Sequence, residues 1–285
     1  DLGIERRAFA TTLPVVQHLG LVASDGERVA LTDAGRRLVE SGMLPTERNL
    51  ETLRDLGRMR EVLTAGGPVR DDEGRSKATR GGVSDDPART ARFLDMLYAG
   101  SASAAKEVLA WLGPKLPAGG AVLDVGGGHG RYARTFADAG FRATLLDLPH
   151  VVTYAKGRHG DALAYIPGDF HALEDFGGPY DLVFFSNIVH GESYEQNAAL
   201  VARAARALRP GGRVAIKDMF LDEVGKEPAN AVFFGLTMLF YTEHGESPSF
   251  RAVDDWFARA GLVRAETVVV DTQTLVCGRR AEERA

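Results

Sequence analysis

A glycine-rich segment near the middle of the chain has the spacing of a nucleotide-binding loop. The apolar run Ala121–Val125 leads directly into Gly126-Gly127-Gly128-His129-Gly130, and residues 131–139 have helical character. Glycines let a backbone turn sharply and approach a ligand where a Cβ would collide, and the first N–H groups of the following helix are free to donate hydrogen bonds. The segment therefore predicts a strand, a ligand-binding loop and a helix, in that order.

A carboxylate follows this loop at the separation expected for ribose recognition. The next apolar run ends at Asp147, about 20 residues beyond the glycines, where a ribose diol would lie. The loop fits the dinucleotide pattern GxGxxG poorly, because it is followed by Tyr132 and Ala133. A nucleotide cofactor without a pyrophosphate is therefore the favoured ligand.

Three further segments are expected at the same edge of the sheet, since ligands of open α/β sheets bind at the carboxyl ends of the strands. Gly168-Asp169-Phe170 follow the third apolar run, Ser186-Asn187 end the fourth, and residues 208–212 precede the fifth. Asp169 could accept a hydrogen bond from an adenine amine while Phe170 packs on the ring. Any one carboxylate, including Asp124, is also consistent with capping a helix or turn. Because all of these residues are expected at the same edge of the sheet, a shared ligand is favoured.

These residues need a sheet to position them, and the pattern of apolar runs predicts one. From Ala121 onward short strands alternate with helical stretches, which is typical of a parallel sheet covered by helices. The expected strands are 121–125, 142–146, 163–166, 181–186, 212–217, 263–270 and 273–279. Only Asp271-Thr272 separate the last two, so they are expected to form an antiparallel hairpin at one edge. Cys277, the single cysteine, is expected to be buried in the last strand.

The first 112 residues have a mainly helical pattern. Residues 8–19 read as a helix, followed by a hairpin around Ser24-Asp25-Gly26 and a second helix capped by Thr32 or Asp33, which together indicate a winged helix. Residues 49–63 and 88–112 are also predicted to be helical, with an exposed connection over 66–87. We place the domain boundary between Leu112 and Gly113, which gives domains 1–112 and 113–285.

Apolar side chains from both domains are expected to form a second part of the pocket. Residues 232–241 are hydrophobic around the whole helical circumference, as expected for a helix buried between domains, and about half of them are attributed to core packing. The remainder, with aromatic and apolar residues of the first domain, would suit a flat apolar ligand. The candidates are Phe93, Met96, Tyr98, Phe234, Met238 and Tyr241. His244 is expected in another wall of the same pocket.

Five motifs carry a resemblance to a known family. The segments LDVGGGHGRYA, LLDLPHVV, PGDF, YDLVFFSNIVH and LRPGGRVAIKD resemble those of class I S-adenosylmethionine-dependent methyltransferases, specifically the O-methyltransferase family of plant caffeate-type and bacterial antibiotic-pathway enzymes. The resemblance covers most of the chain, including the winged-helix domain, which in that family mediates homodimerisation. It implies an α/β fold with a Rossmann-like, mostly parallel sheet and an antiparallel edge strand. It also implies S-adenosyl-L-methionine as cofactor and a small aromatic or polyketide-like acceptor, with O-methylation favoured.

The resemblance also implies which residues hold the cofactor. Gly126 and Gly128 would approach its methionine part, Asp147 its ribose, and Asp169 and Phe170 its adenine. The full set expected to bind the cofactor is Asp124, Gly126, Gly128, Asp147, Leu148, Gly168, Asp169, Phe170, Ser186 and Asn187.

His190 falls at the position of that family's general base, and Asp218 falls where the family often has an acidic residue beside the base. A phenol that attacks a sulfonium methyl benefits from losing its proton, and histidine titrates near the working pH. The family usually shows His-Asp-Trp here, whereas this chain reads His190-Gly191-Glu192. A pocket-lining histidine without catalytic duty, with transfer by proximity alone, therefore stays an alternative. Gly191 also stands where the aspartate of metal-binding relatives would be, so a metal on His190 and His244 is disfavoured and none is expected.

Charge and composition bound the remaining alternatives. The chain of 285 residues has 34 Lys and Arg against 39 Asp and Glu, a net charge of −5, which offers no attraction for nucleic acid or an anionic membrane. Residues 1–60 carry nine acidic and nine basic side chains, which cancel, whereas a DNA-binding regulator with a winged helix would need a basic face. No apolar stretch approaches the roughly 20 residues of a membrane-spanning helix. A cytoplasmic enzyme acting on a small molecule is expected. The acceptor, C- or N-methylation, and a non-methylating relative stay open.

Overall fold

The chain forms two compact units, Asp1–Arg60 and Glu61–Ala285. The computed structural model describes residues 13, 16–24, 28–40, 53–71, 73–76 and 87–280. The predicted domain boundary between Leu112 and Gly113 marks a change in sequence pattern, whereas the two compact units meet at Arg60. The predicted boundary stays a prediction.

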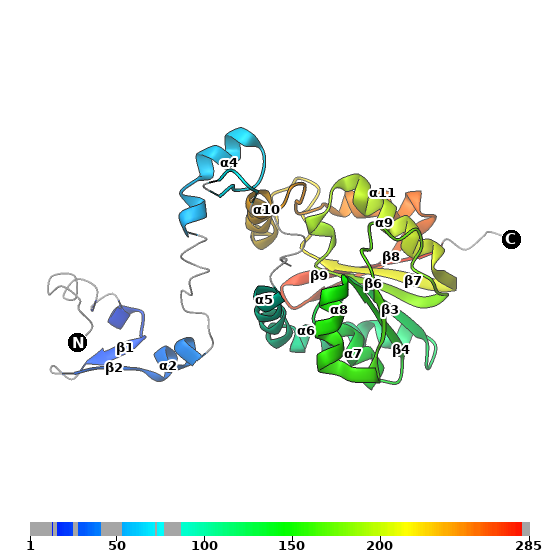
Figure 1. Cartoon of the computed structure of the whole chain (residues 1–285), viewed down its shortest axis with the longest axis horizontal. Coiled ribbons are helices and arrows are strands. Elements are labelled where there is room, and N and C mark those ends of the chain that lie inside the picture. The colour runs from blue at the N-terminus through cyan, green and yellow to red at the C-terminus, as the bar shows by residue number, and fades with distance from the viewer. Residues whose placement is uncertain are drawn as a thin grey trace. The chain divides into compact units, whose positions relative to one another are not determined.

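The first unit contains a small antiparallel hairpin followed by a helix (Figure 1). β1 (Val22–Ser24) pairs with β2 (Val29–Leu31), and α2 (Asp33–Glu40) begins two residues after β2. Thr32 is the N-cap of α2, because its Oγ1 accepts a hydrogen bond from the backbone N–H of Gly35 at 3.0 Å. Most of the predicted helix at 8–19 lies outside the described residues, although residues 16–18 are helical. The winged helix stays a prediction.

The second unit is built on a seven-stranded sheet with the order β5-β4-β3-β6-β7-β9-β8 (Figure 1). Five strands are parallel, and β9 pairs antiparallel with both β7 and β8. The mostly parallel sheet and its antiparallel edge hairpin are therefore confirmed. The strands are β3 (Ala121–Val125), β4 (Arg142–Asp147), β5 (Ala164–Pro167), β6 (Tyr180–Ser186), β7 (Leu208–Asp218), β8 (Leu262–Val270) and β9 (Gln273–Arg280).

Helices cover both faces of this sheet because its strands are apolar on both sides. On one face α6 (Ala102–Leu112), α7 (Arg131–Asp138) and α8 (Pro149–His159) pack on a core that includes Val122 and Cys277. On the other face α9 (Tyr194–Arg206) and α11 (Phe250–Arg259) pack on a core that includes Leu123 and Trp256. Cys277 is fully buried, as predicted.

Two predicted helices are each split in the structure. The helix expected over 88–112 is α5 (Pro87–Gly100) followed by α6, with the break at Ser101. Of the helix expected over 49–63, residues 53–56 are helical and α4 covers Met59–Ala65. Gly57 lies in one break and Gly100 directly precedes the other, and the apolar spacing alone does not reveal the low helix propensity of glycine.

The prediction that residues 232–241 form a helix with apolar side chains buried all round is wrong in one respect. These residues lie in α10 (Ala229–Tyr241), whose buried side chains are Ala231, Met238 and Phe240. Phe233, however, is 71% exposed. An apolar circumference shows that a helix can be buried, but it does not show which side is covered. In the described part of the chain no helix is long and apolar enough to cross a membrane.

Candidate functional site

The glycine loop after β3 has a backbone that only glycine adopts easily. Gly126, Gly128 and Gly130 all have positive φ angles, of 65°, 52° and 73°. A Cβ on Gly126 would lie 2.3 Å from Cδ1 of Ile188, so the loop has no room for a side chain there. The N–H of Gly126 also donates to the carbonyl of Leu146 at 2.8 Å, which ties the loop to β4. The predicted strand, loop and helix are all present, since α7 begins directly after Gly130.

Asp147 ends β4 with its carboxylate against this loop. Its Oδ2 accepts from the N–H of Gly128 at 2.8 Å, and its Oδ1 accepts from the N–H of Leu148 at 2.7 Å. Burial raises the pKa of Asp147 to about 6, against which these two hydrogen bonds act. Each carboxylate oxygen can accept more than one hydrogen bond, so both can still accept from a ligand hydroxyl.

Asp124 accepts a hydrogen bond at the start of α7, which is the capping alternative that the sequence left open for this carboxylate. Its Oδ2 accepts from the N–H of Ala133 at 3.2 Å, in the first turn of α7, and the side chain is 2% exposed. Burial raises the pKa of Asp124 to about 7, and the negative charge of Asp147 adds to this shift. Asp169 likewise holds its own turn, because its Oδ1 accepts from the N–H of His171 at 2.8 Å. These carboxylates therefore order the backbone around the site.

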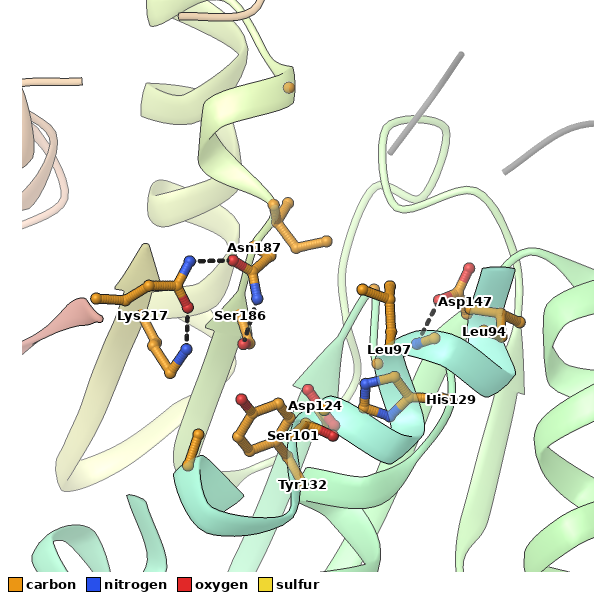
Figure 2. Close-up of a pocket in the computed structure, with 18 of the residues that line it drawn as sticks. Leu94, Leu97, Ser101, Asp124, His129, Tyr132, Asp147, Ser186, Asn187 and Lys217 are labelled. Carbon is orange, nitrogen blue, oxygen red and sulfur yellow. Dashed lines mark hydrogen bonds between the residues drawn. The ribbon is translucent and has the colours of Figure 1, made fainter. Parts of the chain in front are cut away.

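A cavity of about 390 Å³ lies at the carboxyl ends of the parallel strands, within the second unit (Figure 2). Of the predicted cofactor residues, those lining it are Asp124, Gly126, Gly128, Asp147, Leu148, Asp169, Phe170, Ser186 and Asn187. Gly168 does not line it, but its N–H donates to the carbonyl of Asp147 at 2.9 Å. The structure thus brings the glycine loop and the carboxylates together around one cavity, as the sequence predicted.

Only some of the residues predicted to bind the methyl acceptor line the cavity. Phe93 and Met96 of α5 line the cavity. Tyr98 does not line it, but stacks on the guanidinium of Arg131, whose carbon lies 3.5 Å from the ring centroid. The residues of α10 and the loop after it, namely Phe234, Met238, Tyr241 and His244, do not line the cavity either. His244 is exposed.

His190 and Asp218 form a buried pair at the ends of β6 and β7. His190 lies in the short 3-10 helix η3 (Val189–Gly191), and its Nδ1 is 2.8 Å from Oδ1 of Asp218. Asp218 is fully buried and also accepts from the N–H of Met219 at 2.8 Å. When the Asp218 carboxylate is ionised it can only accept, and Nδ1 then carries the proton while Nε2 is left as the basic nitrogen. Phe234 packs edge-on against the imidazole, with centroids 4.7 Å apart.

His190 lies beside the cavity but is not one of the residues that line it. Its chain neighbours Ile188 and Gly191 line the cavity, whereas His190 itself does not and is 8% exposed. Gly191 has open space where a Cβ would be, so the departure from the family's His-Asp-Trp pattern leaves the cavity wall open beside the histidine. The orienting carboxylate for His190 comes from the neighbouring strand.

The cavity is also lined by residues that the sequence did not single out individually, two of which, Gly127 and His129, belong to the predicted ligand-binding loop. His129 is a buried wall residue whose pKa falls to about 4, first through burial and then through the charge of Arg131. It is therefore neutral at physiological pH. The others are Leu94, Leu97, Gly100, Ser101, Ala104, Gly127, Tyr132, Ile188, Gly191, Glu192, Lys217, Met219, Asp271, Thr272 and Gln273. Lys217 was detectable, because a charged residue inside the apolar run of β7 is unusual for a buried strand.

The cavity fits an adenosyl cofactor by its own geometry. The left-handed backbone at Gly126 and Gly128 lies in the cavity wall, and Asp147 offers acceptors for a diol. Phe170 and Asp169 supply an aromatic ring and a carboxylate to the same cavity wall. Among the described residues no three His, Cys, Asp or Glu side chains come together to hold a metal ion.

Comparisons with known proteins agree with this fold. Human N-acetylserotonin methyltransferase, solved in complex with SAM, superimposes with a TM-score of 0.77 at 18% identity over 97% of this chain and 84% of that one. This likeness defines the fold as that of the class I methyltransferases. The O-methyltransferase domain family matches residues 74–262, and the chain belongs to that family. The resemblance noted in the sequence is thereby confirmed.

Two relatives show how far the similarity extends. Acetylserotonin O-methyltransferase of Bos taurus is 32% identical over 132 residues, which cover 44% of this chain and 37% of that protein. Tetracenomycin polyketide synthesis 8-O-methyl transferase TcmO of Streptomyces glaucescens is 28% identical over 169 residues, which cover 55% of this chain and 48% of that protein. The chain therefore spans less than half the length of these curated relatives.

Proposed function

We propose that the chain is an S-adenosyl-L-methionine-dependent O-methyltransferase in which His190 is the general base. The observation that carries the proposal is the buried His190–Asp218 pair, which stands at the edge of a cavity lined by the glycine loop and Asp147. Family membership supports the cofactor and the type of transfer.

The residues that would hold the cofactor follow from their contacts. Asp147 would accept hydrogen bonds from the ribose hydroxyls, and the backbone at Gly126 and Gly128, which lines the cavity, would approach the methionine part. Phe170 would pack against the adenine while Asp169 accepts from its amine. When bound, the cofactor supplies an electrophilic methyl group on a sulfonium.

The chain's own contribution to the chemistry is proton removal and positioning. Nε2 of His190 would take the proton of the acceptor hydroxyl, which makes the oxygen a stronger nucleophile. Asp218 would hold the imidazole in this tautomer and stabilise the imidazolium that forms, as a buried carboxylate does for a catalytic histidine. Phe234 would fix the orientation of the ring.

The acceptor we propose is a small aromatic or polyketide-like molecule. Phe93 and Met96 give the cavity an apolar wall, and Leu94 and Leu97 of the same helix extend it. The relative named for tetracenomycin polyketide synthesis supports this class of acceptor.

The assembly we propose is a homodimer formed through the N-terminal helices. Leu19, Leu53 and Leu63 lie on two of the predicted helices and are 62%, 63% and 60% exposed. A second copy would cover apolar side chains that otherwise face water. Light scattering at micromolar concentration tests this, because a monomer with an intact N-terminal region contradicts it.

We also propose a cytoplasmic location, in keeping with a single, buried cysteine that needs no oxidising compartment.

The experiment that tests the function is a methyl-transfer assay with S-adenosyl-L-methionine and a panel of phenols, including hydroxylated polyketide aromatics. Transfer to oxygen supports the proposal. Transfer only to carbon or nitrogen, or cofactor binding without transfer to any acceptor, contradicts it.

A further inference from the structure

A buried lysine, Lys217, lies in the cavity wall and has no role in the chemistry described above. It stands near the end of β7, directly before Asp218, and is 2% exposed. Its strand neighbours are Ser186 on β6 and Leu275 on β9. The ammonium lies 5.9 Å from the ring centroid of Tyr132, on the face of the sheet that α7 covers. A strongly hydrated cation has therefore been placed where water is largely excluded.

The partners of this ammonium are neutral. Its Nζ donates to Oε1 of Gln273, Nε2 of Gln273 donates to Oδ1 of Asn187, and Nδ2 of Asn187 donates to Oγ of Ser186 (Figure 2). In the part of the chain that the structure describes, Lys217 makes no ion pair. The chain of hydrogen bonds fixes the position of the ammonium and leaves other protons of the NH₃⁺ group free to donate.

The carboxylate next to it in the sequence is already engaged. Asp218 uses Oδ1 for the imidazole of His190 and for the N–H of Met219. Burial lowers the pKa of Lys217, and the negative charges of Asp218, Asp271 and Glu107 oppose that shift without bonding directly to the ammonium. A buried ammonium without a directly bound counter-charge is unfavourable, so a ligand that brings an anion would offset this cost.

The charge of the cavity wall restricts where an anion can bind. Asp124, Asp147, Asp169, Glu192 and Asp271 all line the cavity, and they repel a carboxylate. Lys217 is the only Lys or Arg among the described residues that line it. A carboxylate that enters this cavity therefore has one cation with which to pair.

We propose that Lys217 binds the carboxylate of the cofactor's amino-acid tail, an inference that rests on the proposed function. The sheet order places Asp147 on β4 and Lys217 on β7, with β3 and β6 between them. Strands lie roughly 4.8 Å apart, so the two side chains are separated across the sheet by about 14 Å. An adenosyl ligand with its ribose on Asp147 extends its tail over β3 and β6 toward Lys217. Lys217 is then a specificity residue that distinguishes a full cofactor from a fragment without the tail.

The test is calorimetric binding of two ligands that differ only in the tail. S-adenosylhomocysteine carries the amino-acid group, and 5′-methylthioadenosine does not. In Lys217→Met the affinity for S-adenosylhomocysteine should fall by about 10- to 100-fold, the usual loss for a hydrogen bond to a charged group, and that for methylthioadenosine should stay within about twofold. Lys156→Met, which removes an exposed lysine of α8, should change neither affinity.

The two ligands also control for folding, because retained methylthioadenosine binding shows an intact cavity. Should Lys217→Met fail to fold, Gln273→Glu places a competing carboxylate beside the same ammonium and should weaken S-adenosylhomocysteine alone. Equal loss of both ligands, or no loss of either, overturns the inference while leaving the proposed function intact. Failure of the wild-type chain to bind S-adenosylhomocysteine overturns both.

Discussion

At the β3 and β4 end of the cavity the wall consists of glycine backbone and of carboxylates that accept hydrogen bonds from backbone N–H groups. At the β6 and β7 end the buried carboxylate is paired with an imidazole. Asp147 accepts from Gly128 and Leu148, and burial raises its pKa to about 6. Asp218 accepts directly from His190 at 2.8 Å. The first end is therefore suited to accept hydrogen bonds from hydroxyls, and the second is suited to receive a proton.

The two ends also arise from the sequence in different ways. The glycine loop and Asp147 follow two strands that are adjacent both in the chain and in the sheet. His190 and Asp218 are 28 residues apart and meet only because β7 pairs with β6 after the crossover through α9. Mutations at the two ends should consequently separate binding from turnover.

Removal of the base should have the largest effect on turnover. His190→Ala should bind S-adenosylhomocysteine as the wild type does and transfer methyl groups about 10²- to 10⁴-fold more slowly, the usual contribution of general acid–base catalysis. His18→Ala, at an exposed position of the first unit, is the matched control. Wild-type turnover in His190→Ala would show that proximity alone suffices.

Loss of the orienting charge should cost less. Asp218→Asn keeps His190 in place but removes the carboxylate that fixes its tautomer, and turnover should fall by about 10- to 100-fold, as expected for a lost hydrogen bond to a charged group. The double variant with His190→Ala should be no slower than His190→Ala alone, since both act on one proton transfer. Additive losses in the double variant would separate the two roles.

At the other end the expected effect is on affinity and its pH dependence. Burial raises the pKa of Asp147 to about 6, so the carboxyl gains a proton as the pH falls through 6 and then has fewer lone pairs for ribose hydroxyls. The wild-type affinity for S-adenosylhomocysteine should therefore be about tenfold lower at pH 5 than at pH 7. Asp147→Asn should bind more weakly at pH 7 and lose this dependence, while the exposed Asp161→Asn should keep it. A pH dependence that survives in Asp147→Asn would assign it to another group.

The sequence predicted the residues whose placement is local. Gly126 and Gly128 lie in the loop after β3 and Asp147 ends β4, so their order along the chain fixes their position at one edge of the sheet. Phe93 and Met96 could be assigned to a wall because both lie on one stretch with helical spacing. His190 and Asp218 were paired through the family resemblance, and the structure brings them within hydrogen-bond distance.

What could not be predicted depends on contacts between distant segments. Gln273 reaches the cavity only because the β8–β9 hairpin lies beside β7, and the sequence pattern predicted a hairpin at one edge of the sheet but not which strand it would pair with. Met238 and Tyr241 were expected to line the pocket, but apolar side chains on a helix do not reveal which neighbour they face. The break at Ser101 was hidden because the apolar spacing continues through it.

The central claim is that this cavity holds an adenosyl cofactor with a sulfur-linked amino-acid tail rather than a dinucleotide. Calorimetric titration of the wild-type chain with S-adenosyl-L-methionine, S-adenosylhomocysteine and NAD tests it most directly. The glycine loop, the Asp147 carboxylate and the Lys217 ammonium predict saturable binding of both sulfur nucleotides and much weaker binding of NAD. Tighter binding of NAD than of either sulfur nucleotide would contradict the account.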